Sequence, residues 1–295
     1  MANELLFSLN LDSIHSDIYL CEKTTLFEDS GTVPGPPLVV CDENTADLGV
    51  AFPPGIPVAT VPAGERCKQP GVLLSLLDTF MQTGLTRGST VYAFGGGAVT
   101  DMVAFAGSIY LRGVRVVLIP TSLLAMVDAA VGGKTGIDFY GFKNMIGTFA
   151  PAAEVRIAPA LLDSLPQKEF LSGLAEVLKA AFVGDSTLVN MLETQYQDFL
   201  GRNGSLMSEI IRRAVAVKAA IVQTDFTEQG QRAFLNLGHT FGHALESALG
   251  LSTWTHGEAV AWGIDRAMHA GVAEGITDSE WARRVTDILR SYGYN

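Results

Sequence analysis

The alternation of short apolar runs with helical stretches in the first part of the chain restricts the possible fold most strongly. Four runs rich in β-branched residues have the length of buried strands, at 38–40, 58–61, 89–94 and 113–119. Between the second and third runs, residues 70–80 carry apolar side chains at helical spacing. This order of strand, helix and strand predicts a parallel sheet covered by helices.

The second part of the chain has helical periodicity almost throughout. We expect helices after Ser164, with this residue as N-cap, at about 206–222, near Gly238, near Gly257 and after Thr277, where Thr277 and Glu280 form a capping box. The sequence therefore predicts an α/β domain at 1–160 followed by an all-α domain at 161–295. A cleft between the two domains is the expected location of the functional site.

Composition excludes several classes of protein. Hydrophobic residues make up 48% and charged residues 17% of the 295 residues, which permits a large core. The net charge of −11 argues against binding of nucleic acid. The longest uncharged apolar run, 116–127, is too short to span a bilayer. Three cysteines without CxxC spacing and no signal-peptide pattern indicate a reducing, cytoplasmic location.

A glycine-rich turn follows the third predicted strand. Gly95-Gly96-Gly97 leads directly into an apolar helix. Glycines at this position allow a phosphate to approach the backbone N–H groups at the positive end of the helix. The pattern differs from GxGxxG, and a tight strand-to-helix turn without a ligand explains the glycines equally well.

Three of the five histidines, His239, His243 and His256, lie within eighteen residues. The first two have the i, i+4 spacing that puts both rings on one helical face, and His256 is expected at a helix start. Imidazole is a common zinc ligand, and a catalytic zinc takes three protein ligands and keeps one position open. Glu176 is a further ligand candidate because small residues surround it. Spacing favours His239 and His243 as the chelating pair, whereas core histidines satisfied by the backbone are the alternative.

Several cations lie beside small residues in apolar segments, where an uncompensated charge is costly. They are Arg112, Lys134, Lys143, Lys179, Lys218 and Arg232. Each alone is explained by a surface position or a structural ion pair. Together they indicate a site for phosphate and carboxylate groups, and hence a small anionic substrate.

These segments together resemble 3-dehydroquinate synthases. The matching runs are GGGAVTDMVAFAGSIYLRG, IPTSLLAMVDAAVGGKTGID, FKNMIGTFAP, LPQKEFLSGLAEVLKAAF, RAFLNLGHTFGHALE and HGEAVAWG. The resemblance implies an NAD-binding α/β domain, a helical domain with zinc or cobalt, and a homodimer. It also implies conversion of DAHP, a phosphorylated seven-carbon keto acid, to 3-dehydroquinate in aromatic amino acid biosynthesis. NAD is reduced and reoxidised within each turnover of this reaction.

The resemblance also assigns residues. The metal ligands would be Glu176, His239 and His256, so that His243 faces the substrate. The implied NAD contacts are Asp42, Glu65, Lys68, Gly96, Gly97, Asp101, Thr121, Ser122, Lys134 and Lys143. The implied substrate contacts are Asp128, Lys134, Asn144, Lys179, Lys218, Arg232, Asn236 and His243. Arg112 would reach the phosphate bound in the partner subunit.

Three other functions remain open at this point. The first is another sugar-phosphate cyclase acting on a substrate without a carboxylate, although Arg232, Asn236 and His243 favour the carboxylated substrate. The second is a non-catalytic relative that binds NAD, because the family usually continues beyond the equivalent of Asn295 with a phosphate-binding lysine that has no counterpart here. The third is a polyol dehydrogenase of the wider superfamily.

Overall fold

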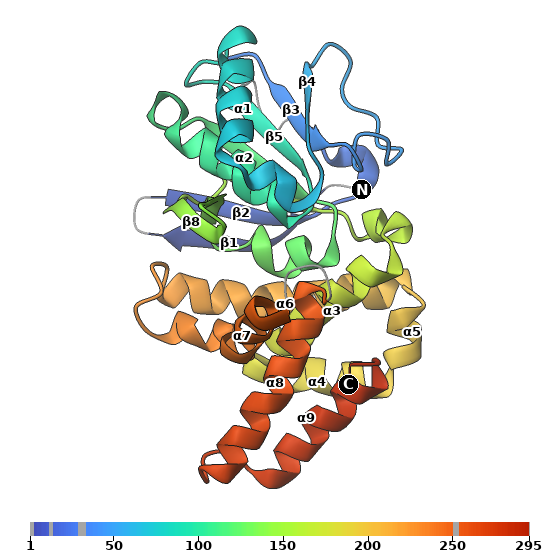
Figure 1. Cartoon of the computed structure of the whole chain (residues 1–295). Coiled ribbons are helices and arrows are strands. Elements are labelled where there is room, and N and C mark those ends of the chain that lie inside the picture. The colour runs from blue at the N-terminus through green and yellow to red at the C-terminus, as the bar shows by residue number, and fades with distance from the viewer. Residues whose placement is uncertain (1–2, 12–13, 29–33, 250–253, 295) are drawn as a thin grey trace. The chain divides into compact units, whose positions relative to one another are not determined.

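The computed structural model describes residues 3–11, 14–28, 34–249 and 254–294 (Figure 1). The chain divides into two compact units, Met1–Ser164 and Leu165–Asn295. The first contains all strands of the described chain, and the second contains α3 to α9. No helix within the described ranges is long and apolar enough to cross a membrane.

The first unit is built on a seven-stranded sheet. Its strands are β1 (Glu4–Leu11), β2 (Ile14–Leu20), β3 (Leu38–Asp42), β4 (Val58–Val61), β5 (Thr90–Gly95), β6 (Arg115–Pro120) and β9 (Glu154–Ile157). The strand order is β1-β2-β9-β6-β5-β3-β4. All neighbours pair in parallel except β1 and β2. The predicted parallel sheet is therefore confirmed, and an antiparallel strand at one edge is added to it.

Two helices cover strands of this sheet, α1 (Pro70–Gln82) and α2 (Gly97–Ile109) (Figure 1). Helix α2 is almost entirely apolar and packs on β5 and β6. In β5 the alternate residues Tyr92 and Phe94 pack on the rings of Phe27 and Phe52. Residues two apart in a strand share one face. In β3 and β5 every residue is buried, so both faces of these two strands are covered and they lie in the interior of the sheet.

The remaining elements of the first unit are short. A separate hairpin joins β7 (Lys134–Phe139) and β8 (Phe142–Phe149). The helical turns are η1 (Lys23–Thr25), η2 (Gly64–Lys68), η3 (Tyr110–Arg112), η4 (Ala125–Ala129) and η5 (Pro159–Ser164). Strand β8 is exposed along its whole length. It therefore has no buried face, and its sequence lacks the apolar run that predicts a buried strand.

The second unit is helical, as predicted. Its elements are α3 (Gln167–Gly184), α4 (Ser186–Thr194), α5 (Tyr196–Leu200), α6 (Gly204–Thr224), η6 (Gln231–Asn236), α7 (His239–Leu249), α8 (His256–Ala273) and α9 (Ser279–Ser291). Helix α3 is the core helix, because it packs against α4, α6 and α8. Small residues such as Gly173, Ala175 and Ala180 leave space for these neighbours.

Two predicted helix caps are wrong. Ser164 does not cap α3, which begins at Gln167 after Pro166. The residue before a proline is disfavoured in the helical conformation, so Leu165 cannot open the helix. Thr277 does not cap α9 either, because its N–H donates to Gly271 O at 3.0 Å and helps to end α8. Asp278 caps α9 instead and accepts from the N–H of residue 281.

Candidate functional site

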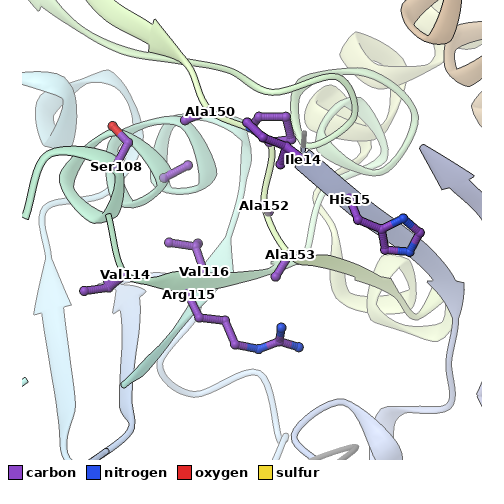
Figure 2. Close-up of a pocket in the computed structure, with 11 residues that line it drawn as sticks. Ile14, His15, Ser108, Val114, Arg115, Val116, Ala150, Ala152 and Ala153 are labelled. Atoms are coloured by element: carbon purple, nitrogen blue, oxygen red, sulfur yellow. The ribbon is translucent and has the colours of Figure 1, made fainter. Parts of the chain in front are cut away.

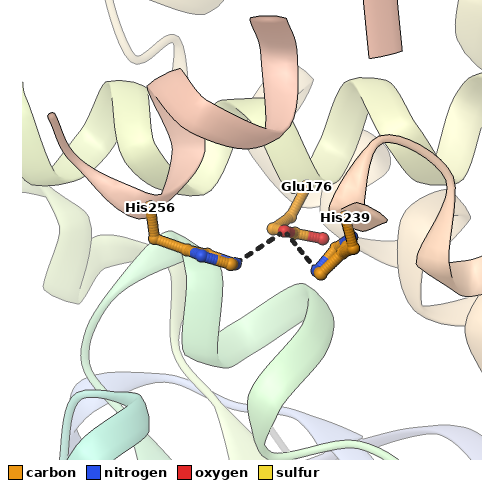
Figure 3. A group of neighbouring side chains, drawn as sticks. All are labelled: Glu176, His239 and His256. Carbon is orange, nitrogen blue, oxygen red and sulfur yellow. Dashed lines mark ion pairs between the residues drawn. The ribbon is translucent and has the colours of Figure 1, made fainter. Parts of the chain in front are cut away.

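Three predicted metal ligands meet in the second unit (Figure 3). Glu176 lies in α3, and His239 and His256 are the first residues of α7 and α8. Glu176 Oε1 is 3.8 Å from His239 Nε2 and 3.4 Å from His256 Nε2. The Glu176 side chain is fully buried, whereas that of His256 is 31% exposed. The group therefore combines a buried carboxylate with two imidazoles, one of which is open to solvent.

Local sequence brings His256 close to Glu176. Thr255 and Glu258 form a capping box, in which the Glu258 carboxylate accepts from Thr255 N at 2.7 Å, and this fixes the start of α8. Gly257 then allows α8 to approach α3, because a Cβ at 257 would lie 2.2 Å from Ser172 O. Gly257 N also donates to Ser172 Oγ at 3.1 Å. One turn along α3 from Ser172, Glu176 faces the histidine.

A second close contact joins the two histidine-bearing helices. A Cβ at Gly263 of α8 would lie 2.0 Å from Gly238 O, immediately before α7. Only glycine permits such a backbone approach. As a result, the rings of His239 and His256 have centroids 5.4 Å apart.

Hydrogen bonds orient the rings of both histidines. His239 Nδ1 lies 3.4 Å from Leu237 O, and since a carbonyl only accepts, Nδ1 is the donor and Nε2 is left for Glu176. His256 Nδ1 lies 3.4 Å from Glu246 Oε1, while its Nε2 points to Glu176. Both rings therefore present Nε2 to the same carboxylate.

The carboxylates around His256 favour a positive charge at this position. Burial by itself lowers the pKa of His256, but the carboxylates of Glu176 and Glu246 outweigh this effect and raise the pKa to about 9. Lys179 forms an ion pair with Glu176 Oε2 one turn along α3. The second oxygen of Glu176, Oε1, faces the two histidines.

The spacing of the three side chains fits a zinc ion. Two ligands bound to one tetrahedral zinc at about 2.1 Å lie about 3.4 Å apart. The observed separations of 3.4 and 3.8 Å are close to this value, and all three ligand atoms lie within 4.8 Å of one another. Two imidazoles and one carboxylate form a donor set that catalytic zinc sites use, with a position left open.

His243 belongs to a second group of metal-binding side chains. It lies with Glu246 and His256, and the ligand atoms of these three are also within 4.8 Å of one another. Among the described residues, neither group contains both His239 and His243, the pair favoured by spacing alone. The rings of His239 and His243 are perpendicular, with centroids 5.3 Å apart.

The other residues predicted for the second unit lie on elements that pack on α3 or its neighbours. Lys218 is buried on α6, which packs against α3. Arg232 is buried in η6. Its guanidinium donates to Phe226 O, and its backbone N–H donates to Asp225 Oδ2 at 2.9 Å. Asn236 is exposed, and its amide donates to Glu228 Oε1 at 2.7 Å. The substrate contacts predicted for these three residues stay predictions.

Seven of the ten residues predicted to bind NAD lie at the carboxyl edge of the parallel strands in the first unit. Gly96 and Gly97 follow β5, Thr121 and Ser122 follow β6, Asp42 ends β3, and Glu65 and Lys68 lie in η2 after β4. Ligands of open α/β sheets bind at this edge. At Gly96 a Cβ would lie 3.7 Å from Ser122 Oγ, and at Gly97 it would lie 3.2 Å from Ala129 Cβ, so side chains there would fill the space between the two turns. The start of α2 thus offers bare backbone N–H groups, which suit a pyrophosphate.

Asp42 has its carboxylate engaged within the protein. Its Oδ1 accepts from Thr45 N at 2.8 Å and from Thr45 Oγ1 at 2.9 Å. Thr45 Oγ1 is also 3.2 Å from Phe94 O. These bonds fix the turn after β3 beside the end of β5, and Asp42 keeps a second oxygen for a ligand.

Lys68 joins a predicted NAD contact to a predicted substrate contact. Its side chain is 4% exposed and lies 2.8 Å from Asp101 Oδ2, and it also donates to Asn144 Oδ1. Asn144 has φ +53°, a left-handed conformation, and its N–H donates to the buried Asp138 at 2.9 Å. The structure thus brings Lys68, Asp101 and Asn144 together.

Four more predicted residues of the first unit are at least partly exposed. Lys134, Lys143 and Arg112 are exposed, and Asp128 is half-buried in η4. Arg112 has φ +65° at the end of η3, and Arg87 Nε donates to the preceding carbonyl, Leu111 O, at 3.1 Å. This left-handed turn after α2 presents Arg112 at the surface.

A pocket of about 270 Å³ in the first unit lies elsewhere (Figure 2). Its walls are largely apolar, with Val114, Val116 and Ala152 among them, and it also contains His15 and Arg115. Arg115 begins β6, so the pocket lies at the amino end of that strand. None of the residues predicted to bind NAD or substrate is among those that line it.

Sequence reasoning missed several side chains that contact predicted site residues. They include Glu246 beside His256, Glu228 beside Asn236, and Asp138 beside Asn144. Only Glu246 had a usable signal, because it lies seven residues after His239 and so shares the helical face of the histidines.

Comparison with known proteins covers both units. Residues 58–172 match the family model described as 3-dehydroquinate synthase N-terminal, and residues 173–295 match that described as 3-dehydroquinate synthase C-terminal. The chain is 41% identical to a 3-dehydroquinate synthase of Solibacter usitatus over 81% of this chain and 68% of that protein. It is 44% identical to the same enzyme of Acinetobacter baumannii over 80% of this chain and 66% of that protein. The aligned part thus spans about two thirds of these relatives.

Solved structures show the same fold. A 2-epi-5-epi-valiolone synthase of Streptomyces hygroscopicus, with NAD⁺ and Zn²⁺ bound, aligns with a TM-score of 0.86 at 28% identity, over 97% of this chain and 82% of that one. A 2-deoxy-scyllo-inosose synthase aligns with a TM-score of 0.85 at 20% identity, over 98% of this chain and 81% of that one. With both units matched and 41% identity over most of its length, the chain belongs to the 3-dehydroquinate synthase family.

Proposed function

We propose that the protein is a 3-dehydroquinate synthase, a carbon–oxygen lyase that converts DAHP to 3-dehydroquinate and phosphate. The group formed by Glu176, His239 and His256 carries this proposal, because its spacing fits a zinc ion in a protein of this family. Relatives at 38–46% identity bear the name of this enzyme.

We propose NAD and zinc, or cobalt in its place, as the cofactors. Bound to this chain, zinc supplies Lewis acidity toward a substrate hydroxyl, and NAD supplies a hydride acceptor that is restored before the product leaves. Glu176, His239 and His256 would hold the metal. The turns after β3, β4, β5 and β6, with Gly96 at the start of α2, would hold NAD.

The cationic side chains would bind the two anionic groups of the substrate. In our proposal Arg232 pairs with the carboxylate in a fork geometry, because its guanidinium is buried and anchored by Phe226 O. Lys134, Asn144 and the partner subunit's Arg112 stabilise the leaving phosphate in a homodimer. The remaining substrate contacts would come from Asp128, Lys179, Lys218, Asn236 and His243.

Release of phosphate from DAHP tests the proposal. The purified 295-residue chain is assayed with NAD and zinc, before and after treatment with EDTA. We expect release that EDTA abolishes and added zinc restores. Failure to release phosphate, from folded protein that binds NAD and zinc, would refute the proposed activity.

One observation favours the alternative that the protein is a sugar-phosphate cyclase with a substrate other than DAHP. The 2-epi-5-epi-valiolone synthase matches with a TM-score of 0.86, so the fold accommodates cyclases with other substrates. The buried Arg232 favours the carboxylated substrate. We therefore expect turnover of DAHP and none of sedoheptulose 7-phosphate, and the reverse preference would assign the chain to this alternative.

A further inference from the structure

Glu246 in α7 contacts His256 on the side opposite Glu176. Its carboxylate lies 3.4 Å from His256 Nδ1, while His256 Nε2 lies 3.4 Å from Glu176 Oε1. Glu246 is 8% exposed, so this carboxylate is largely removed from water. Burying a carboxylate is costly unless a donor or cation compensates it, and His256 Nδ1 is such a donor.

Helix periodicity brings Glu246 to this position. His239, His243 and Glu246 have the spacing i, i+4 and i+7, which places all three on one face of α7. That face meets the start of α8, because α7 and α8 pack closely and the rings of His243 and His256 have centroids 6.2 Å apart. The contact therefore follows from the packing of two helices.

The two histidines of the metal group are held in corresponding ways. His239 Nδ1 faces Leu237 O at 3.4 Å, and His256 Nδ1 faces Glu246 Oε1 at the same distance. In each case an acceptor takes the Nδ1 proton, so that Nε2, the nitrogen that faces Glu176, is the one left for a metal. A carboxylate in this role also makes the imidazole more basic, and thus a stronger ligand.

We propose that Glu246 is a positioning residue that fixes the tautomer and orientation of His256 for metal binding. The inference rests on the proposed metal group of Glu176, His239 and His256. It assigns Glu246 no contact with the metal itself. The competing arrangement is the second group, in which His243, Glu246 and His256 would be the ligands.

The metal affinity of Glu246 variants, compared with a matched control, tests this role. Zinc is titrated in competition with a chromophoric chelator, and cobalt binding is followed by visible absorption. For Glu246→Ala we expect a loss of affinity of roughly 10–100-fold, the usual effect of removing such a partner. Glu246→Gln keeps a carbonyl acceptor for Nδ1 and is expected to recover part of the loss. Glu280→Gln is the matched control, because Glu280 is exposed on α9, and it is expected to bind like the wild type.

The outcomes separate the inference from the proposed function. If the wild-type chain binds neither zinc nor cobalt, the proposed metal group itself is wrong. If the wild type binds and Glu246→Ala binds equally well, only the role of Glu246 is refuted. If Glu246→Ala and His243→Ala abolish binding while Glu176→Gln has no effect, the metal occupies the second group, and the positioning role is refuted. Circular dichroism reports in each variant whether the helical second unit, which contains all the substituted residues, is folded.

Discussion

The close approach of α8 to α3 at Gly257 makes a sharp prediction about the metal group. In Gly257→Ala the new methyl group would lie 2.2 Å from Ser172 O and 2.5 Å from Ser172 Cα. Ordinary contacts begin at about 3.4 Å, so the two helices must separate by about 1 Å. Both atoms belong to the backbone, so a side-chain rotation cannot relieve the clash.

The expected cost follows from this displacement. Overpacking of a well-packed interior costs about 1–3 kcal/mol. For a unit of this size, each kcal/mol lowers the melting temperature by roughly 3–5 °C. Since His256 precedes residue 257, the same separation would move its Nε2 away from Glu176, now 3.4 Å from Oε1. We therefore expect Gly257→Ala to lower both the melting temperature of the second unit and its affinity for zinc.

Gly204→Ala is the matched control. Gly204 begins α6 in the same unit, and no atom lies within 4 Å of a Cβ built there. Alanine in place of this glycine is expected to be neutral or to stabilise the helix by up to about 1 kcal/mol. Melting is followed by circular dichroism and zinc affinity by competition with a chelator. Equal melting temperatures and affinities for the two variants would refute the reasoning.

Three further predictions concern stability. Zinc at about 100 times its Kd should stabilise the second unit by about 2.7 kcal/mol, and Glu176→Gln should lose this gain in the same melting experiment. Asp101→Asn should destabilise the first unit by about 1–3 kcal/mol in urea, because it removes the anionic partner of the buried Lys68 at 2.8 Å. Burial lowers the pKa of Lys68, but the charge of Asp101 outweighs this effect and raises the pKa above 10.5. The difference in the free energy of unfolding between wild type and Asp101→Asn should therefore be constant near neutral pH and disappear as the pH rises through the folded-state pKa of Lys68. A difference that grows at high pH would contradict this. Asp185→Ala should destabilise the second unit by about 1–2 kcal/mol, because Asp185 caps α4 and binds Arg213 at 3.0 Å. Asp185→Asn keeps the cap and should cost less. Equal losses of stability in the two variants would show that the cap contributes nothing.

Elements with strong local signals were predictable from the sequence. The strand predicted at 58–61 is observed as β4, Val58–Val61, but it is an edge strand with only Val61 buried and not the buried strand that was predicted. The helix predicted at 70–80 is observed as α1, Pro70–Gln82. Both have a clear apolar period or run, and Pro70 marks the helix start. The hairpin of β7 and β8 was not predicted, because β8 is exposed along its length and has no buried face to impose alternation.

Helix starts were less predictable, since capping depends on neighbouring backbone. Thr277 looked like a cap but is engaged in ending α8, so the role passes to Asp278. Conversely, the capping box of Thr255 and Glu258 was present in the sequence and is the one that positions His256.

The candidate metal group shows the limit of local patterns. Residue types and spacing indicated histidines in a helical domain, and helical period places His239, His243 and Glu246 on one face. Which nitrogen atoms converge depends on three helices that meet from separate parts of the chain. The close packing of α3, α7 and α8, permitted by glycines at their contacts, brings Glu176 and His256 to His239 and leaves His243 in a second group. Such contacts join residues distant in sequence, and a periodic pattern reports only which face a side chain takes, not what lies opposite it.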